Sequence, residues 1–369
     1  MTSGENGDAA AMERLRALPV QLMNTDYGVI LVRGLVELRI SGDRADAVVP
    51  EVIAATSEHG GIPRRDLLER FAATDREMVG ALVDELRKRF IVVPVGEEAS
   101  PQGEESALEV FYWHFGQRAD TVTAELNSKP IVLMGVNAVS ERIALSLAAL
   151  GVTAVRVVDF NALRNMRLYD GEGVLRRDAW HGPPPLAYDD WASSLATDGI
   201  RCLVATSDFG GPYLMRDWNR YCVEEGVHFL PVVLDKFVGT VGQLVIPGET
   251  ACYECFRLRE NANMDSAEIQ RAAEKGAGER QGIVGFHPAM AGMLGEVAAM
   301  ELTKLYGGGV PWSANRVIEI RLLVPSMTTR RVLKLPRCPV CSTTRTTSSV
   351  YLDKESFVPG HQLNYHEFR

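Results

Sequence analysis

The chain has 369 residues, enough for two domains, and 46% of them are hydrophobic, enough to fill two cores. Its formal net charge of −9 argues against a protein that binds nucleic acid nonspecifically. The small, acidic start is unlike a signal peptide, and no apolar run is long enough to span a bilayer. We therefore expect a cytoplasmic protein with neither nucleic acid nor membrane among its partners.

Residues 1–97 predict a first domain of short strands and helices. Two helices carry start signals, with Pro50 at the first position of one and Thr74 as the N-cap of another. The expected elements are strands over 27–32, 35–40 and 90–95 and helices over 50–57, 64–72 and 75–89. Small strands with three helices, the last two joined by a short turn, predict a winged helix-turn-helix-like fold.

The charge of this domain favours a peptide over DNA as its ligand. Residues 64–89 contain seven basic and six acidic residues, without the basic surplus that phosphate contacts need. An open strand edge beside a near-neutral helix suits an added peptide strand. The residues expected to contact the peptide are Val36, Leu38, Ile40, Arg76, Val79 and Val83. The alternatives are a domain that only packs on its neighbour and a regulator that binds DNA.

The polar stretch EEASPQGEES at 97–106 predicts a linker, which we place at 98–106. The second domain, 107–369, ends in a tail at 351–369 and alternates strands with helices. A strand at 131–134, a glycine turn, a helix over 141–150 and a strand over 155–158 form a β-α-β unit that closes on Asp159. Further buried strands at 201–205 and 227–233 predict an α/β fold with a Rossmann-type, mostly parallel sheet.

The glycine turn departs from a dinucleotide-binding fingerprint, in which glycines let the backbone approach phosphate. Gly135 is present, but Asn137 and Ser140 stand at the second and third glycine positions. The Asn137 side chain is expected to crowd a phosphate. Asp159 could bind a ribose hydroxyl, and it could equally cap a helix. The turn by itself does not establish a nucleotide site.

Two Cys-x-x-Cys knuckles lie far apart in the second domain, Cys252 with Cys255 and Cys338 with Cys341. Four thiolates at this spacing predict one tetrahedral zinc site that joins two distant segments. Because four cysteines fill the coordination sphere, the expected role is structural rather than catalytic. A redox dithiol is the alternative, and neither knuckle follows a thioredoxin-like strand–helix pattern.

The second domain resembles the ThiF/MoeB-like, ubiquitin-activating-type adenylating fold. The resemblance rests on residues 135–159, on LRNMR at 163–167, on ATSD at 205–208, on GTVGQ at 239–243 with the knuckles, and on the helix over 287–306. It implies an ATP site in which Asp159 holds ribose, Arg164 or Arg167 holds phosphate, and Asp208 lies near magnesium. The lysine of that family is missing, because none occurs over 131–235, and no cysteine between the knuckles could form a thioester. We therefore expect a degenerate nucleotide site, without ATP or Mg²⁺ on this chain, at Gly135, Asn137, Asp159, Arg164, Arg167 and Asp208.

A winged-helix peptide binder ahead of a degenerate ThiF-like domain resembles the partner proteins of YcaO cyclodehydratases, whose first domain is a precursor-peptide recognition element. Residues 109–116, EVFYWHFG, resemble theirs too. The resemblance implies a non-catalytic adaptor that binds the leader of a ribosomally made precursor peptide. The adaptor would present this peptide to a YcaO-type enzyme for azoline formation, and a homodimer is compatible with the fold. The alternative is an ATP-dependent ThiF/MoeB-like adenylating enzyme that acts on a peptide.

Overall fold

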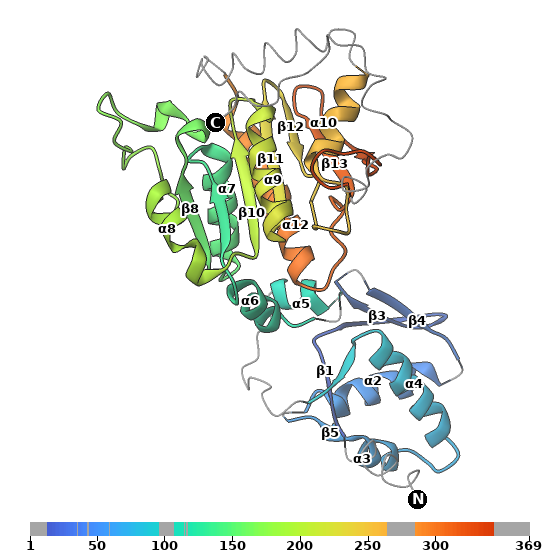
Figure 1. The fold of residues 1–369 in the computed structure, drawn as a ribbon. Helices are drawn as coiled ribbons and strands as arrows, with labels where there is room; N and C mark the ends of the chain where they lie inside the picture. The colour runs from blue at the N-terminus through green and yellow to red at the C-terminus, as the bar shows by residue number, and fades with distance from the viewer. Residues whose placement is uncertain are drawn as a thin grey trace, which may run out of the picture. The chain divides into compact units, whose positions relative to one another are not determined.

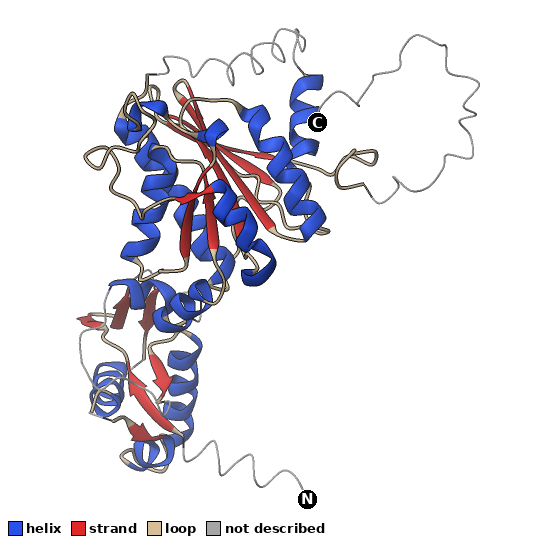
Figure 2. Ribbon diagram, turned by 60° about the vertical axis from the view of Figure 1, so that its left-hand side comes forward, coloured by secondary structure: helices blue, strands red, loops and turns tan. Residues whose placement is uncertain are grey.

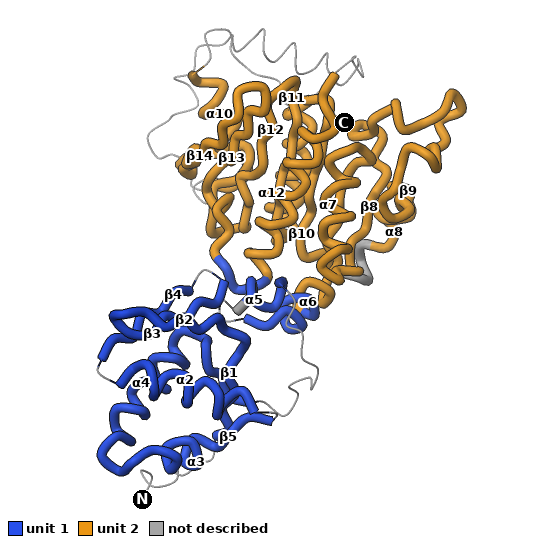
Figure 3. The backbone as a smooth tube through the Cα atoms, turned by 180° about the vertical axis from the view of Figure 1, so that it is seen from behind, with its two compact units in different colours: residues 1–124, 307–309 blue, residues 125–306, 310–369 orange. Residues whose placement is uncertain are grey.

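The computed structural model describes residues 13–95, 107–263 and 285–342, apart from residues 35, 43, 59, 114 and 116. The chain divides into two compact units, one of residues 1–124 with 307–309 and one of residues 125–306 with 310–369 (Figure 3). The predicted linker at 98–106 and the tail at 351–369 lie outside the described residues. The domain boundaries at 97 and 107 therefore remain a prediction, and residues 107–124 are grouped with the first unit.

The first unit contains two small antiparallel sheets. One has the order β5-β1-β6 and is built from Arg14–Ala17 (β1), Ile62–Pro63 (β5) and Val92–Pro94 (β6). The other has the order β2-β3-β4 and is built from Gln21–Thr25 (β2), Gly28–Arg33 (β3) and Val36–Ile40 (β4). Within the described residues β4 pairs only with β3, so its second edge is open.

Three helices build the core of the first unit against these strands (Figure 1). They are Ala45–Thr56 (α2), Arg64–Glu69 (α3) and Arg76–Lys88 (α4). The amphipathic α4 buries Val79, Gly80, Val83 and Leu86, which recur at helical spacing. They meet apolar side chains of α2 and of the sheet, including Leu31 and Leu38.

The local signals of this unit differ from expectation at three points. Helix α2 begins at Ala45, so Pro50 lies inside it and forfeits the backbone bond to the residue 46 carbonyl. The N-cap of α4 is Asp75 rather than Thr74, and its side chain makes no capping bond. Strands β1 and β2 were not predicted, because RLRA and QLMNT lack β-branched runs and depend on their partner strands.

Two helices follow the undescribed linker, Ala107–Trp113 (α5) and Ala119–Asn127 (α6). Glu109 connects them, because its carboxylate accepts a hydrogen bond of 3.1 Å from the Ala119 nitrogen. Helix α5 belongs to the first unit, whereas α6 crosses the division at residue 124. Helix α5 covers the first part of the stretch EVFYWHFG at 109–116.

The second unit is built on an eight-stranded sheet of order β14-β13-β12-β11-β10-β7-β8-β9. Four neighbouring pairs are parallel and three are antiparallel. The strands are Ile131–Met134 (β7), Val155–Asp159 (β8), Leu186–Ala187 (β9), Cys202–Ser207 (β10), His228–Asp235 (β11), Val238–Val241 (β12), Arg316–Arg321 (β13) and Ser326–Arg331 (β14). The predicted α/β class with a mostly parallel sheet is confirmed, and its antiparallel end was not predicted.

Helices cover both faces of this sheet (Figure 2). The main ones are Ala138–Ala149 (α7), Tyr188–Asp198 (α8), Met215–Glu225 (α9), Tyr253–Ala262 (α10) and Pro288–Tyr306 (α12). Helices α7 and α12 pack together on one face, where Gly295 has no room for a side chain: a Cβ there would lie 2.6 Å from the Arg142 Cβ. Helices α8 and α9 lie on the other face (Figures 1 and 3). Among the helices that the structure describes, none combines the length with the apolar composition that a membrane span requires.

Candidate functional site

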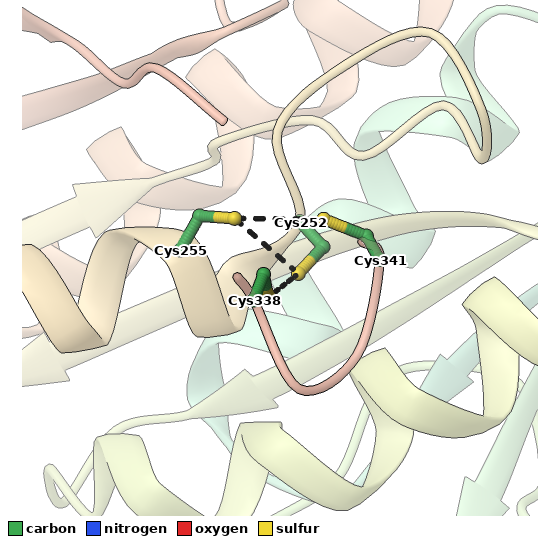
Figure 4. A group of neighbouring side chains, drawn as sticks. All are labelled: Cys252, Cys255, Cys338 and Cys341. Atoms are coloured by element: carbon green, nitrogen blue, oxygen red, sulfur yellow. Dashed lines mark hydrogen bonds between the residues drawn. The ribbon is translucent and has the colours of Figure 1, made fainter. Parts of the chain in front are cut away.

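Four cysteines come together where α10 begins and a loop after β14 returns to it (Figure 4). The Cys252 Sγ lies 3.5 Å from the Cys338 Sγ, and the Cys255 Sγ lies 3.5 Å from the Cys341 Sγ. All four sulfur atoms lie within 4.8 Å of one another. Tetrahedral ligands about 2.3 Å from a zinc ion lie roughly 3.8 Å apart, so this cluster has the dimensions of a metal site.

Polar side chains hold the first knuckle in place. Gln243 is fully buried, and its Nε2 donates to the Ala251 carbonyl at 2.5 Å and to the Cys252 carbonyl at 2.7 Å. Asn219 accepts a hydrogen bond of 2.8 Å from the Tyr253 nitrogen. These contacts fix the backbone around Cys252.

Contacts between the thiols shift the pKa values of Cys252 and Cys341 in opposite directions. The pKa of Cys252 is raised, chiefly by hydrogen bonding with Cys255, whereas hydrogen bonding from Cys252 lowers the pKa of Cys341 to about 2. A divalent cation would favour the thiolate form of all four and release the remaining protons. The four predicted ligands are therefore brought together in a cluster that could hold a metal ion.

A second group of predicted residues lies where β7 ends and α7 begins. Gly135 has a φ of +108°, and a Cβ there would lie 2.8 Å from the Leu163 Cβ. The backbone conformation and the packing at position 135 therefore account for the glycine without a bound nucleotide. Asn137, fully buried, is the N-cap of α7 and forms a capping box with Ser140.

The start of α7 has no free donor. The Asn137 nitrogen donates to the Ser140 Oγ at 3.1 Å, and the Val139 and Ser140 nitrogens donate to the Asn137 Oδ1 at 3.1 and 3.2 Å. The remaining first-turn nitrogen, that of Ala138, donates to the Asp208 Oδ2 at 2.9 Å. All four N–H groups that a helix leaves unpaired at its start are therefore used inside the protein.

Further hydrogen bonds hold the buried side chains of Asn137 and Asp208. The Asn137 Nδ2 donates to the Thr206 Oγ1 at 2.9 Å and to the Thr206 carbonyl at 3.0 Å. The Asn165 Nδ2 donates to the Asp208 Oδ2 at 2.8 Å. Burial raises the pKa of Asp208, and its Oδ1 has no hydrogen-bond partner within the described residues.

Of the other predicted nucleotide-site residues, Asp159 and Arg164 are paired with each other, whereas Arg167 is exposed. The Arg164 guanidinium grips Asp159 with hydrogen bonds of 2.5 and 2.9 Å, which raise the pKa of the arginine. This fork occupies both oxygens of the carboxylate that was expected to bind ribose. Arg167 is exposed, and its charge lowers the pKa of the nearby Asp208.

The predicted peptide-contacting residues are not one surface. Val79 and Val83 are fully buried and Leu38 is 8% exposed, so these three side chains build the core and are unavailable to a peptide. Arg76 lies at the start of α4, where its Nε donates to the Phe71 carbonyl at 3.2 Å. Val36 and Ile40 are half-buried on the open strand β4. We predicted that the apolar side chains of Val79 and Val83 on α4 contact a ligand, but in the structure they pack in the core.

A cavity of about 480 Å³ lies at the opposite end of α4 from Arg76. It is lined by Arg33, Val36, Glu85, Lys88, Arg89, Phe90 and Val110. Of the predicted peptide-contacting residues, Val36 alone is among these. Sequence reasoning missed Phe90, although an aromatic residue directly after a helix with a basic end was visible. It also missed Asn165, which donates to Asp208, and Thr206, which accepts from Asn137.

No protein-family model matches the sequence, and no curated protein matches it. Among solved structures, the fold is similar to that of the microcin C7 biosynthetic enzyme MccB in complex with N-formylated MccA, with a TM-score of 0.65 and 18% identity over 89% of this chain and 99% of that one. E. coli MccB with ATP gives a TM-score of 0.63 and 16% identity over the same shares. A heterocyclase in complex with substrate and cofactor gives 0.56 and 16%, and this chain spans 40% of its length. At these identities the likeness shows a shared fold.

Proposed function

We propose that this protein is a non-catalytic adaptor in the modification of a ribosomally synthesised precursor peptide. The first unit, as a winged-helix-like recognition element, binds the leader of the precursor. The second unit, ThiF-like in fold, presents the peptide to a separate YcaO-type cyclodehydratase that forms azoline rings. The observation that carries the non-catalytic part is the closed start of α7, where the side chains of Asn137, Ser140 and Asp208 accept from all four free N–H groups.

A phosphate at a helix start is held by free N–H groups and by the positive end of the helix dipole. Here those groups are saturated, and the Asp208 carboxylate sits 2.9 Å from the Ala138 nitrogen with a charge that repels phosphate. The ribose-binding carboxylate, Asp159, is held by Arg164. The residues present therefore do not fit ATP and Mg²⁺.

The peptide-binding part is supported by the open edge of β4 and by the cavity next to it. A peptide that adds to an exposed edge gains main-chain hydrogen bonds there, and pockets for its side chains supply selectivity. A leader held in this way keeps many core residues near one active site, because tethering raises their effective concentration. The adaptor needs no chemistry of its own for this benefit.

The structural comparisons support a role in peptide modification. MccB shares the fold and is known in complex with N-formylated MccA, and the heterocyclase that shares it was solved with a substrate. The cysteine cluster supports a structural Zn²⁺ held by Cys252, Cys255, Cys338 and Cys341, which would join α10 to the loop after β14. A zinc ion with four protein ligands has no open position for a substrate.

A reconstituted reaction tests the proposal. A cyclodehydratase, its precursor, ATP and this protein are mixed, and mass spectrometry counts the loss of one water per ring formed. We expect ring formation to need this protein, and Asp208→Asn to support it as well as the unchanged protein does. Asp189→Asn, which removes a charge in the same way at an exposed carboxylate, is the matched control. Circular dichroism checks that both variants are folded. Loss of ring formation with Asp208→Asn alone would contradict a non-catalytic role.

The second candidate is an adenylating enzyme that activates a peptide with ATP. It is favoured by one observation: the buried Asp208 Oδ1 has no hydrogen-bond partner within the described residues, as a carboxylate waiting for a cation would. Release of pyrophosphate by this protein with a precursor peptide and Mg²⁺, but without any cyclodehydratase, would establish this candidate in place of the adaptor.

A further inference from the structure

Phe90 places an aromatic side chain in the lining of the cavity beside β4. Phe90 follows α4 with a φ of +54°, the left-handed conformation that glycine usually supplies at the end of a helix. Its nitrogen donates to the Arg87 carbonyl at 3.0 Å, and the next residue, Ile91, returns to the core with no exposure. Phe90 itself is 37% exposed. A strained, exposed aromatic residue that lines a cavity points to a function in that cavity.

The rim of the cavity carries a surplus of positive charge. Glu85 accepts a hydrogen bond of 2.9 Å from the Arg89 Nε and lies 3.8 Å from the Lys88 Nζ. Among the described lining residues, one carboxylate thus faces two exposed cations. The Lys88 side chain is 75% exposed and its ion pair is long, so a ligand carboxylate can replace Glu85 at little cost.

Val36 belongs both to the open strand β4 and to the lining of this cavity. Val36 is the first residue of β4, opposite Arg33 of β3, and it lines the cavity together with Phe90. A peptide strand added beside β4 would direct alternate side chains toward the same face. Side chains two residues apart on such a peptide could therefore reach the apolar surface of Phe90 and the basic rim at the same time.

We infer that this cavity selects acidic peptide strands. An aliphatic or aromatic side chain packs against Phe90 and Val36, and an Asp or Glu two residues away pairs with Lys88 and Arg89. The inference rests on the proposed function and names the chemical class of leader that the first unit accepts. Apolar burial supplies the anchor, and the charge excludes peptides with a basic residue at the second position.

A selection from random peptides tests this without knowledge of the natural leader. A displayed library of random 12-residue peptides is selected on the immobilised full chain, on Lys88→Glu/Arg89→Glu and on a matched control, Arg65→Glu/Arg70→Glu. The control reverses two charges of the same unit that are also paired with glutamates, on α3 and directly after it. Circular dichroism confirms that each variant is folded.

The unchanged chain and the control are expected to enrich peptides with Leu, Ile or Phe two residues from Asp or Glu, at least tenfold over the starting library. Lys88→Glu/Arg89→Glu is expected to enrich Lys or Arg at that second position. Phe90→Gly, which suits the left-handed turn, is expected to keep the acidic preference and lose the apolar one. Two results would overturn the inference but not the proposed function. In the first, the enriched peptides show no charge preference. In the second, Lys88→Glu/Arg89→Glu enriches the same acidic peptides as the unchanged chain. No enriched peptide on the unchanged chain would contradict both.

Discussion

Asp208 and Ala138 are joined by a hydrogen bond of 2.9 Å between a buried carboxylate oxygen and the first backbone nitrogen of helix α7. The same carboxylate oxygen accepts from Asn165, so the helix start, β10 and the loop after β8 meet at one atom. This arrangement places an internal anion where a nucleotide-binding helix receives phosphate.

Asn137→Ala is expected to lower the free energy of unfolding by about 2 kcal/mol or more, because it removes an N-cap and leaves buried partners such as Thr206 unpaired. Chemical denaturation followed by circular dichroism measures the change. Asn161→Ala, at an exposed asparagine in the same unit, is the matched control and should change stability by less than about 0.5 kcal/mol. Equal effects of the two changes would show that Asn137 does not hold the helix start.

Asp208→Asn is expected to stabilise the protein more at pH 7 than at pH 4. Burial raises the pKa of Asp208 above its ordinary value of 3.8, so the folded state binds this proton more tightly than the unfolded state does. Its contribution to stability is present below about pH 3.8 and is lost as the pH rises through the folded pKa. Thermal melts of both proteins at several pH values measure the difference, and a difference in Tm that shrinks with rising pH would contradict this reading.

Cys338→Ser is expected to abolish stoichiometric zinc and to lower Tm, because three thiolates hold the ion less well and the loop after β14 loses its attachment to α10. Plasma mass spectrometry of the purified protein measures the metal. Cys202→Ser removes a buried thiol outside the cluster and should leave the metal content at one ion per chain. Metal that survives Cys338→Ser would remove the second knuckle from the site.

Much of the second unit could be predicted because its signals are local. Buried apolar runs such as residues 131–134 predict parallel strands, and the two knuckles predict a shared cluster. The antiparallel end of the sheet was not predicted, because β14 has every residue exposed and its pairing with β13 alone makes it a strand. The hydrogen bonds at the start of α7 join residues 137, 165 and 208, and no sequence spacing encodes such contacts.

The first unit shows a second limit. Val79 and Val83 repeat at helical spacing, and this pattern predicts a buried face without saying whether a core or a ligand buries it. The structure puts them in the core and places the cavity at the other end of α4, beside Phe90. The left-handed backbone of Phe90 is invisible in sequence, because glycine is the residue that normally marks such a turn.

Replacing Val83 or Val36 by alanine distinguishes a residue that packs in the core from one that contacts the peptide. Val83→Ala is expected to lower the free energy of unfolding by about 2 kcal/mol, because Val83 is fully buried, and to leave peptide affinity of the folded protein unchanged. Val36→Ala should cost about 0.5 kcal/mol or less and weaken binding of a peptide selected on the unchanged chain. Denaturation curves and fluorescence anisotropy measure the two quantities. A weaker affinity for Val83→Ala than for Val36→Ala would move the groove back toward the middle of α4.

Titration calorimetry of the full chain with ATP and Mg²⁺ measures whether the start of α7 is closed to triphosphate. E. coli MccB, whose structure with ATP shares this fold, is the positive control. We predict no saturable heat for this chain under conditions in which MccB binds, both without and with a peptide selected on the first unit. Saturable binding of ATP that Asp208→Asn abolishes would contradict the claim that the start of α7 is closed to triphosphate.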